Sequence, residues 1–370
     1  MSASNKIRRL RAAYSRQTMT LLDVYDLTTR FATTRGDLVA VDAVSLALDR
    51  GETVGIVGES GSGKSILVRS IMNILPRNAI VEPESRIILD GRNVRDLTLA
   101  EARHFFGVEI AIVFQDPTTS LNPVKKIGTQ LTEPIRYHLR LDRSAARARA
   151  VELLERVGIP EPVRRMGQYP HELSGGMRQR VMIAIAISCR PKVLIADEPT
   201  TALDVTVQKQ ILDLLQHLQE ELGMAMILMT HDLGVVAGRT DRIGVMYAGR
   251  LVEMAPTREL FSTPRHPYTV ALMESIPRIE LPSHTPLRPI PGRPPDMTAP
   301  PPGCKFAARC SHAQPRCLQD DPGLIAIDGA AHQYCCFYPA GSEEGDAALL
   351  RNVEAGRNAA GLDLEAEPVS

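Results

Sequence analysis

The chain has 370 residues, enough for one large domain and a smaller one. Lys plus Arg equals Asp plus Glu, 43 each, so the net charge does not predict a nucleic-acid partner. No apolar run approaches the roughly 18–20 residues of a membrane-spanning helix, so we expect membrane association to run through a partner or the protein surface. Residues 1–19 are basic and lack the apolar stretch of a secretory signal, which predicts a disordered arm and makes Met19 a candidate start.

The first patterned segments predict strands and one helix. Leu21–Leu48 alternates apolar and polar residues, which is typical of antiparallel strands. Gly51–Gly58 has the composition of a short buried strand that runs into a glycine loop. Lys64–Leu75 follows with helical spacing and should end before Pro76.

The middle of the chain predicts an α/β fold with a parallel sheet. We expect a mainly helical insertion at about residues 118–180. Val193–Ala196 and Met224–Met229 are continuous apolar runs typical of parallel strands covered on both faces, and Val205–Leu222 between them has helical spacing. The main domain is expected at residues 20–255.

After residue 255 the composition changes. Ten prolines lie within Pro277–Pro302 and exclude a regular helix or a central strand there, and five of the six cysteines follow. We expect a small Pro- and Cys-rich module at residues 256–340. Residues 341–370 are rich in Ala, Gly and Glu and have little to bury, which predicts a disordered tail.

A complete phosphate-loop pattern, G-x-x-x-x-G-K-S, begins at Gly58. In such a loop the glycines let backbone N–H groups surround a phosphate at a helix N-terminus. Lys64 is expected on the β- and γ-phosphates of a nucleotide, and Ser65 is expected to offer its hydroxyl to Mg²⁺. The predicted phosphate-binding residues are Gly58, Ser60, Gly61, Ser62, Gly63, Lys64 and Ser65.

Two acids follow the apolar run at Val193–Ala196. Asp197 and Glu198 would therefore lie at the carboxyl edge of a parallel sheet, where ligands bind. We expect Asp197 to hold the Mg²⁺ shell and Glu198 to polarise the attacking water.

With these elements in place, the chain resembles the nucleotide-binding subunits of ATP-binding-cassette (ABC) transporters over nearly its whole length. Gln115 matches the family's Q-loop, which senses the γ-phosphate, contributes to the Mg²⁺ site and touches the membrane subunit. His231 matches the switch histidine that contacts the γ-phosphate, and residues 202–204 match the D-loop. Phe31 sits where the family keeps an aromatic ring on adenine, with Tyr25 as a nearby competitor. The resemblance implies an α/β P-loop NTPase core with an antiparallel β flank and a helical insertion.

The sequence Leu173–Arg180 matches the family signature. Ser174, Gly175 and Gly176 would open a helix whose N-terminus faces an anion. In the family that anion is the ATP of the opposite subunit. The resemblance thus implies a second ATPase subunit, and it favours a different homologue over an identical copy.

Narrower patterns resemble the oligopeptide and dipeptide importers, namely Asp116–Pro123, Arg265–Thr269 and the Cys-bearing region. This implies an ATPase, peripheral on the cytoplasmic face of the cell membrane, that energises uptake of short peptides. Two membrane-spanning permease subunits and an extracytoplasmic peptide-binding protein would be its partners. Nickel and glutathione importers share this ATPase type, so the ligand stays open. The rivals are a soluble cassette ATPase that acts on ribosomes or DNA and a redox-sensing regulator.

The cysteine spacing leaves iron–sulfur, zinc and free thiols open, because it lacks the C-x-x-C pattern usual for zinc. The family resemblance implies a [4Fe–4S] cluster held by Cys304, Cys310, Cys317 and Cys336. Cys336 fits the last ligand better than Cys335. Because the module is far in sequence from the ATPase motifs, we expect it to have a structural or regulatory role.

Overall fold

The computed structural model describes residues 20–201, 203–275, 289–327 and 331–364. The basic arm at 1–19, Ala202 of the D-loop pattern and the end of the tail lie outside these residues.

The strands are β1 Thr20–Thr33, β2 Gly36–Asp49, β3 Thr53–Val57, β4 Ala79–Val81, β5 Arg86–Leu89, β6 Arg92–Asn93, β7 Ile110–Val113, β8 Val193–Asp197, β9 Ala225–Thr230, β10 Arg242–Tyr247, β11 Arg250–Pro256, β12 Ile325–Ala326 and β13 Gln333–Tyr334. The helices are α2 Lys64–Ile71, α3 Leu99–Phe105, α4 Pro117–Ser120, α5 Ile127–Leu139, α6 Arg143–Arg156, α7 Pro162–Arg165, α8 Gly175–Ala186, α9 Val205–Leu222, α10 Leu233–Val236, α11 Thr257–Ser262, α12 Pro267–Glu274, α13 Pro315–Gln319 and α14 Glu343–Glu354. Three 3₁₀ turns are η1 Val94–Asp96, η2 Pro170–Glu172 and η3 Ala307–Arg309.

The core is an eight-stranded sheet in the order β12-β13-β11-β10-β3-β9-β8-β7. Its central strands β10, β3, β9, β8 and β7 are parallel, and β11, β13 and β12 continue it antiparallel. Strands β3, β8 and β9 are buried along their whole length, because apolar residues cover both faces. Ile56 and Ile227 pack into the core on one face, and Val57 and Leu228 into the core on the other. The α/β fold predicted from the apolar runs is therefore confirmed.

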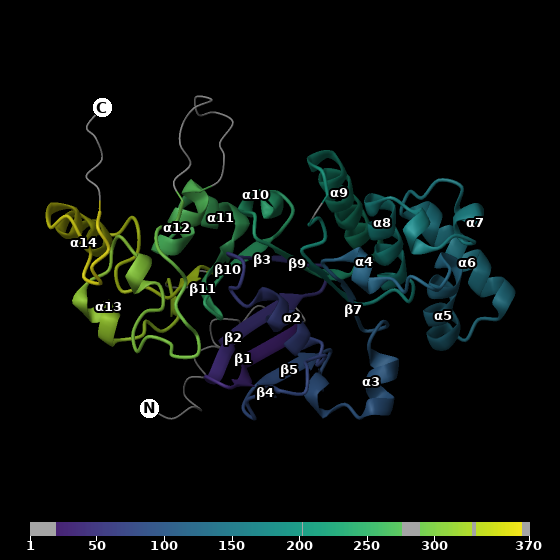
Figure 1. Cartoon of the computed structure of the whole chain (residues 1–370), viewed down its shortest axis with the longest axis horizontal. Coiled ribbons are helices and arrows are strands. Elements are labelled where there is room, and N and C mark those ends of the chain that lie inside the picture. The colour runs from purple at the N-terminus through teal and green to yellow at the C-terminus, as the bar shows by residue number, and fades with distance from the viewer. Residues whose placement is uncertain (1–19, 202, 276–288, 328–330, 365–370) are drawn as a thin grey trace.

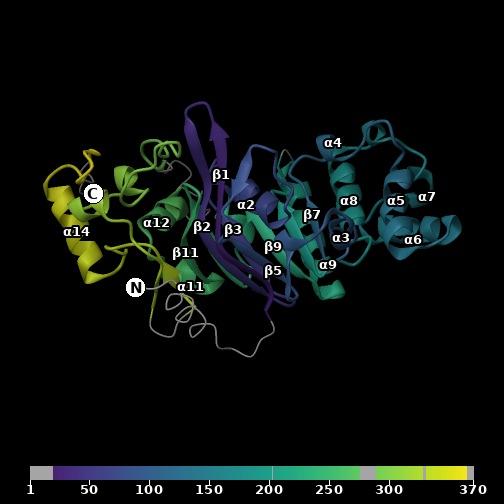
Figure 2. The same cartoon turned by 90° about the horizontal axis from the view of Figure 1, so that it is seen from below.

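A smaller antiparallel sheet covers one face of the core. Its order is β2-β1-β5-β6, with β4 paired to β1. Leu22 and Leu46 from this sheet and Leu67 from α2 belong to the same hydrophobic core as Ile56. Helix α2 thus lies between the two sheets (Figure 2). The alternation over Leu21–Leu48 correctly predicted the first two of these strands.

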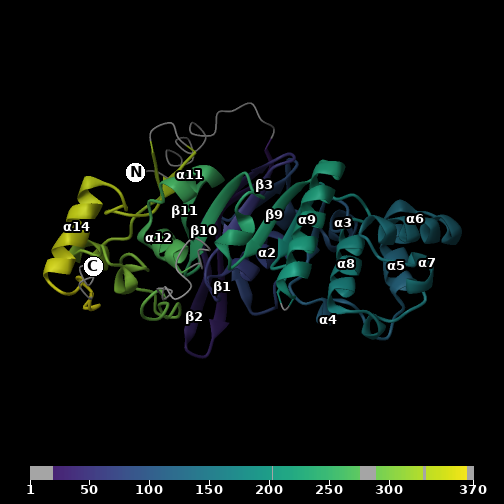
Figure 3. The same cartoon turned by 90° about the horizontal axis from the view of Figure 1, so that it is seen from above.

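The helices α4–α8 lie at one end of the molecule, and the C-terminal module with α13 and α14 lies at the other end (Figures 1 and 3). Helix α9 coincides with the predicted helix Val205–Leu222. Helix α2, in contrast, ends at Ile71 instead of Leu75, because Asn73 takes a left-handed backbone angle (φ 50°) that stops a helix. No helix in the described ranges is long and apolar enough to cross a membrane.

The C-terminal module is joined to the main domain by the core sheet itself. Strand β13 pairs with β11, so the predicted boundary at residue 255 falls at the end of a shared strand. His332 directly precedes β13, and Glu253 lies on β11. Nε2 of His332 lies 2.7 Å from Oε1 of Glu253, and both side chains are fully buried. Burial lowers the pKa of His332, but the carboxylates of Glu253 and Glu259 outweigh burial and raise it. A charged imidazole therefore fits this contact between module and core.

The tail differs from the predicted disorder, because α14 forms within it. Ser342 caps this helix by accepting the N–H of Gly345 at 3.0 Å. Asn352 donates its amide to the carbonyl of Ala313 at 3.0 Å, and Asn358 donates to the carbonyl of Cys310 at 2.9 Å. The tail is thus held on the module by buried amides, which its low content of apolar residues does not reveal.

Candidate nucleotide site

The phosphate loop connects β3 to α2, and its glycines are needed for close backbone approach. Gly63, the N-cap of α2, has φ +103°, and a Cβ there would lie 2.4 Å from the carbonyl oxygen of Ala40. A Cβ on Gly58 would lie 2.1 Å from the carbonyl oxygen of Met246. Since real atoms do not approach this closely, only glycine fits both positions. Because the first N–H groups of an α-helix have no partner within the helix, those of α2 are candidates to bind an anion.

Lys64 lies inside the loop. Its ammonium donates to the carbonyls of Gly58 at 2.7 Å and Glu59 at 3.1 Å, and it is 3.6 Å from Oε1 of Glu198. Burial lowers the pKa of Lys64, and the nearby carboxylates of Glu198 and Asp197 oppose that change. The Lys64 ammonium is thus held inside the phosphate loop by two of the loop's own carbonyl groups.

Ser65 and Asp197 meet beside the loop. The Ser65 hydroxyl donates to Oδ1 of Asp197 at 3.3 Å. Burial raises the pKa of Asp197, and the hydrogen bond from Ser65 acts in the opposite direction. A buried carboxylate next to a hydroxyl is an oxygen donor set that suits Mg²⁺, whose remaining ligands are commonly water and phosphate.

Glu198 is the centre of the site. Its Oε2 accepts from Nε2 of Gln115 at 2.9 Å and from the hydroxyl of Thr201 at 3.2 Å, and it lies 3.5 Å from Nδ1 of His231. The backbone of Glu198 has φ +45°, a left-handed angle that costs a non-glycine residue on the order of 1 kcal/mol. The carboxylate at this position is held by Gln115 and Thr201.

Adjacent parallel strands bring these groups together. Gln115 follows β7, Asp197 ends β8 and is followed by Glu198, and His231 follows β9. Glu198, Gln115 and His231, the predicted catalytic residues, thus converge beside the phosphate loop, and the His231 side chain is 61% exposed. Thr201 was not predicted, although its place three residues after Glu198 in the same turn was a usable signal.

The signature residues do not join this group. Ser174 caps α8 by accepting the N–H of Met177 at 3.3 Å, as the pattern predicted. A Cβ on Gly176 would lie 2.9 Å from the side chain of Val207 in α9, so α8 and α9 meet closely there. Among the hydrogen bonds and ion pairs of the described residues, none links residues 174–176 to the phosphate loop. Their predicted action on a partner's nucleotide stays a prediction.

Phe31 lies on β1, in register with Leu38 of β2 and Ala79 of β4. Its ring is 9% exposed, so little of the ring surface faces solvent. The adenine contact predicted for it stays a prediction, and so does the choice between Phe31 and Tyr25.

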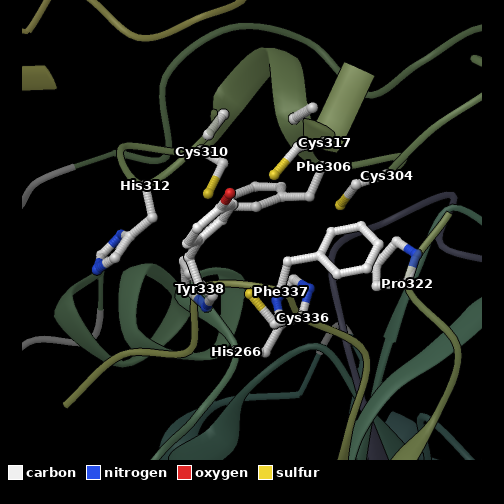
Figure 4. A pocket seen from close by; sticks show the side chains of 13 residues that line it. His266, Cys304, Phe306, Cys310, His312, Cys317, Pro322, Cys336, Phe337 and Tyr338 are labelled. Atoms are coloured by element: carbon white, nitrogen blue, oxygen red, sulfur yellow. The ribbon is translucent and has the colours of Figure 1, made fainter. Parts of the chain in front are cut away.

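Four of the six cysteines line one cavity in the C-terminal module (Figure 4). They are the predicted ligands Cys304, Cys310, Cys317 and Cys336, and all are free thiols. Cys335 is not among the residues that line this cavity, and its sulfur instead lies 3.6 Å from the carbonyl of Leu251.

The four thiols share one electrostatic environment. Burial raises the pKa of each, to about 11 for Cys304, and the neighbouring Cys336 and Cys304 raise that of Cys310 further. Within the described residues, however, no three His, Cys, Asp or Glu side chains are arranged to hold a single metal ion.

Sequence reasoning missed three residues that link the loop to the C-terminal part of the chain. They are Glu59 within the loop, Tyr268 of α12 and Arg309 of the module. The glycine and lysine pattern leaves position 59 unspecified, and no local pattern marks Arg309. Only the fold brings these residues together.

The fold and the site define an ATP-binding cassette, the ATPase unit of ABC transporters. A family model described as "ABC transporter" matches residues 41–201, and one described as "Oligopeptide/dipeptide transporter, C-terminal region" matches residues 252–317. The chain therefore carries both regions in succession.

Individual relatives cover most of the chain. It is 48% identical over 307 residues to the oligopeptide transport ATP-binding protein OppD of Bacillus subtilis (strain 168), covering 83% of this chain and 86% of that one. It is 46% identical over 322 residues to the dipeptide transport ATP-binding protein DppD of Escherichia coli (strain K12), covering 87% and 97%. The chain belongs to the family of ABC-transporter ATPases that carry the oligopeptide/dipeptide transporter C-terminal region.

A solved structure agrees with the fold. The ATP-binding cassette MJ0796, a dimer in a post-hydrolysis state bound to ADP and Pi, superposes with a TM-score of 0.58 at 29% identity. The match covers 64% of this chain and 99% of that chain.

Proposed function

We propose that this chain is the ATP-hydrolysing subunit of an importer for di- and oligopeptides, peripheral on the cytoplasmic face of the cell membrane. One observation carries the proposal: an ABC-transporter ATPase region and the oligopeptide/dipeptide C-terminal region stand in one chain. Relatives that match along most of their length are named peptide transport ATP-binding proteins.

The geometry of the site supports a separate role in ATP hydrolysis for each of its side chains. The N–H groups of the loop and the Lys64 ammonium bind the β- and γ-phosphates. Ser65 and Asp197 are placed to hold Mg²⁺, with Gln115 as the third predicted ligand. When bound, Mg²⁺ neutralises charge on the phosphate oxygens.

Glu198 accepts a proton from the attacking water and orients it toward the γ-phosphorus. His231 lies beside it as the contact to the γ-phosphate. Gln115 and Thr201 fix the Glu198 carboxylate by donating to the same oxygen, Oε2.

The position of the signature residues supports a second ATPase subunit as a partner. Because the helix opened by Ser174, Gly175 and Gly176 does not contact the chain's own loop, it is available for the ATP of a second ATPase subunit. We infer a homologue in a heterodimer, two membrane-spanning permease subunits and, indirectly, an extracytoplasmic peptide-binding protein. Nickel or glutathione is the alternative cargo, since the selective surfaces belong to those partners.

We further infer that the four cavity thiols hold a [4Fe–4S] cluster. The donor set fits: four cysteines from separate segments line one cavity, and four thiolates suffice for such a cluster. Thiols that are hard to ionise when empty become thiolates when a metal binds them, because the metal charge reverses the effect of burial. The cluster would supply cross-links between the separate segments that carry the four cysteines.

Purification of the tagged full chain from detergent-solubilised membranes tests the transport role. The expected result is co-purification of two integral membrane proteins and a second ATPase. Recovery of ribosomal RNA or DNA in their place would favour a soluble cassette ATPase and overturn the proposal.

A further inference from the structure

Arg309 makes a bidentate ion pair with Glu59 of the phosphate loop. It ends the 3₁₀ turn η3, directly before Cys310, and its side chain is 3% exposed. Nη1 donates to Oε2 of Glu59 at 2.7 Å, and Nη2 donates to Oε1 of Glu59 at 3.0 Å. This parallel arrangement fixes direction as well as distance, which a single contact does not.

The other donors of Arg309 are also engaged. Nε donates to the carbonyl of Pro291 at 2.7 Å, Nη2 to the carbonyl of Ile290 at 3.3 Å, and Nη1 to the hydroxyl of Tyr247 at 3.3 Å. With the two bonds to Glu59, these contacts use all five N–H groups of a guanidinium. The Pro-rich segment, the module and the loop are thereby connected through one side chain.

Glu59 is equally constrained from its backbone. Its N–H donates to the hydroxyl of Tyr268 at 2.9 Å, and Tyr268 is fully buried in α12. Its carbonyl accepts from the Lys64 ammonium at 3.1 Å and from the N–H of Ser62 at 3.1 Å. Any shift of Glu59 therefore reaches the lysine that binds phosphate and the turn that carries the loop N–H groups.

We propose that Arg309 is a positioning residue for nucleotide binding, which holds the phosphate loop in its binding shape through Glu59. The folded state of the cysteine module then sets the ATP affinity of the chain. The sequence predicted a structural or regulatory role for the module, and the contact of Arg309 with Glu59 gives that role a physical route to the phosphate loop. Arg309 would act in this way whatever the cargo of the transporter and whether or not the module holds a metal cluster.

Titration of the purified full chain with ADP and with the non-hydrolysable analogue AMP-PNP tests the positioning role of Arg309. Arg309→Gln and Glu59→Gln should each raise the Kd for both nucleotides by about 10-fold, because each removes one half of a partly buried, charge-assisted bidentate pair. The double variant should be no weaker than either single variant, since both remove the same interaction. Arg309→Lys should recover part of the affinity, because lysine keeps the charge but loses the fork.

Lys305→Met is the matched control. Lys305 also joins the module to the main domain, through Asp42 at 2.7 Å and the carbonyl of Ala248 at 2.9 Å, but its ammonium makes neither a hydrogen bond nor an ion pair with Glu59. It should leave the Kd within twofold of the wild-type value.

If Arg309→Gln unfolds the module, Glu59→Gln still tests the role of this ion pair. Glu59 is on the loop, so Glu59→Gln leaves the hydrogen bonds within the module in place. Unchanged nucleotide Kd in Glu59→Gln would overturn the proposal. So would additive losses in the double variant, or an equal loss in Lys305→Met.

Discussion

At the scale of single residues, the site is organised around one carboxylate. Glu198 receives a hydrogen bond from Gln115, another from Thr201, and lies close to His231 and Lys64. These groups come from four segments, so the position of the carboxylate depends on the whole sheet edge. Phosphoryl transfer requires mainly positioning and charge stabilisation, which is what this arrangement provides.

The first prediction concerns this carboxylate. Glu198→Gln should lower the ATP turnover of the assembled complex by roughly 100-fold or more, because an amide cannot take the proton of the attacking water. Nucleotide binding should be retained, since Lys64 and the loop are unchanged. Steady-state phosphate release and ADP titration measure the two effects, and near-wild-type turnover would contradict the role of Glu198.

Local sequence patterns predicted those residues whose role depends on a short motif. The loop, Asp197, Glu198 and the N-cap at Ser174 all depend on neighbours within a few positions. The pair of Arg309 and Glu59, separated by 250 positions, could not be predicted in that way. Nothing near either residue specifies its partner, and only the packing of the module against the main domain creates the contact.

At the scale of elements, the sequence predicted strands well because they are apolar on both faces. Strands β8 and β9 are each within one or two residues of the predicted runs. The end of α2 and the existence of α14 were missed for different reasons. The first depends on the backbone angle of Asn73, and the second on buried amides of Asn352 and Asn358 that contact another segment.

The second prediction concerns the cysteine module as an element. Cys310→Ser should lower its thermal stability and abolish iron binding, because one of four ligands to the proposed cluster is removed. Anaerobically purified wild-type protein should be brown, with about four iron and about four sulfide per chain.

Cys335→Ser is the control for this variant, because Cys335 does not line the cavity. It should keep the iron. Stoichiometric zinc without sulfide in the wild-type protein, or no metal at all, would contradict the cluster while leaving the ATPase assignment in place.

At the scale of the whole molecule, the helical insertion and the cysteine module lie at opposite ends, with the ATP site between them (Figures 1 and 3). The module continues the core sheet through β13 and contacts the loop through Arg309. The insertion carries the signature helix α8, which the described contacts do not join to the chain's own loop. This separation of the signature helix from the loop is compatible with the proposed pair of ATPase subunits, in which each subunit would contribute to both ATP sites.

The third prediction tests that pairing. In a heterodimer with a wild-type partner, Ser174→Arg should leave nucleotide crosslinking at this chain's phosphate loop largely intact while abolishing hydrolysis in the opposite site. The reason is steric and electrostatic, because a large cation replaces the hydroxyl at the helix N-terminus. Ser144→Arg, on the exposed first turn of α6, is the control and should change neither quantity. Loss confined to the loop of the mutated chain would contradict the shared site.

The central claim is that ATP hydrolysis by this chain drives peptide uptake. The most direct measurement is ATP-dependent accumulation of a labelled dipeptide and a labelled oligopeptide in proteoliposomes that contain the purified complex and its binding protein. Labelled nickel and glutathione serve as competing cargo, and a complex with Glu198→Gln serves as the inactive control. We predict peptide accumulation that requires ATP and is lost in the Glu198→Gln complex. Accumulation of nickel or glutathione without peptide, or peptide uptake that survives Glu198→Gln, would contradict the account.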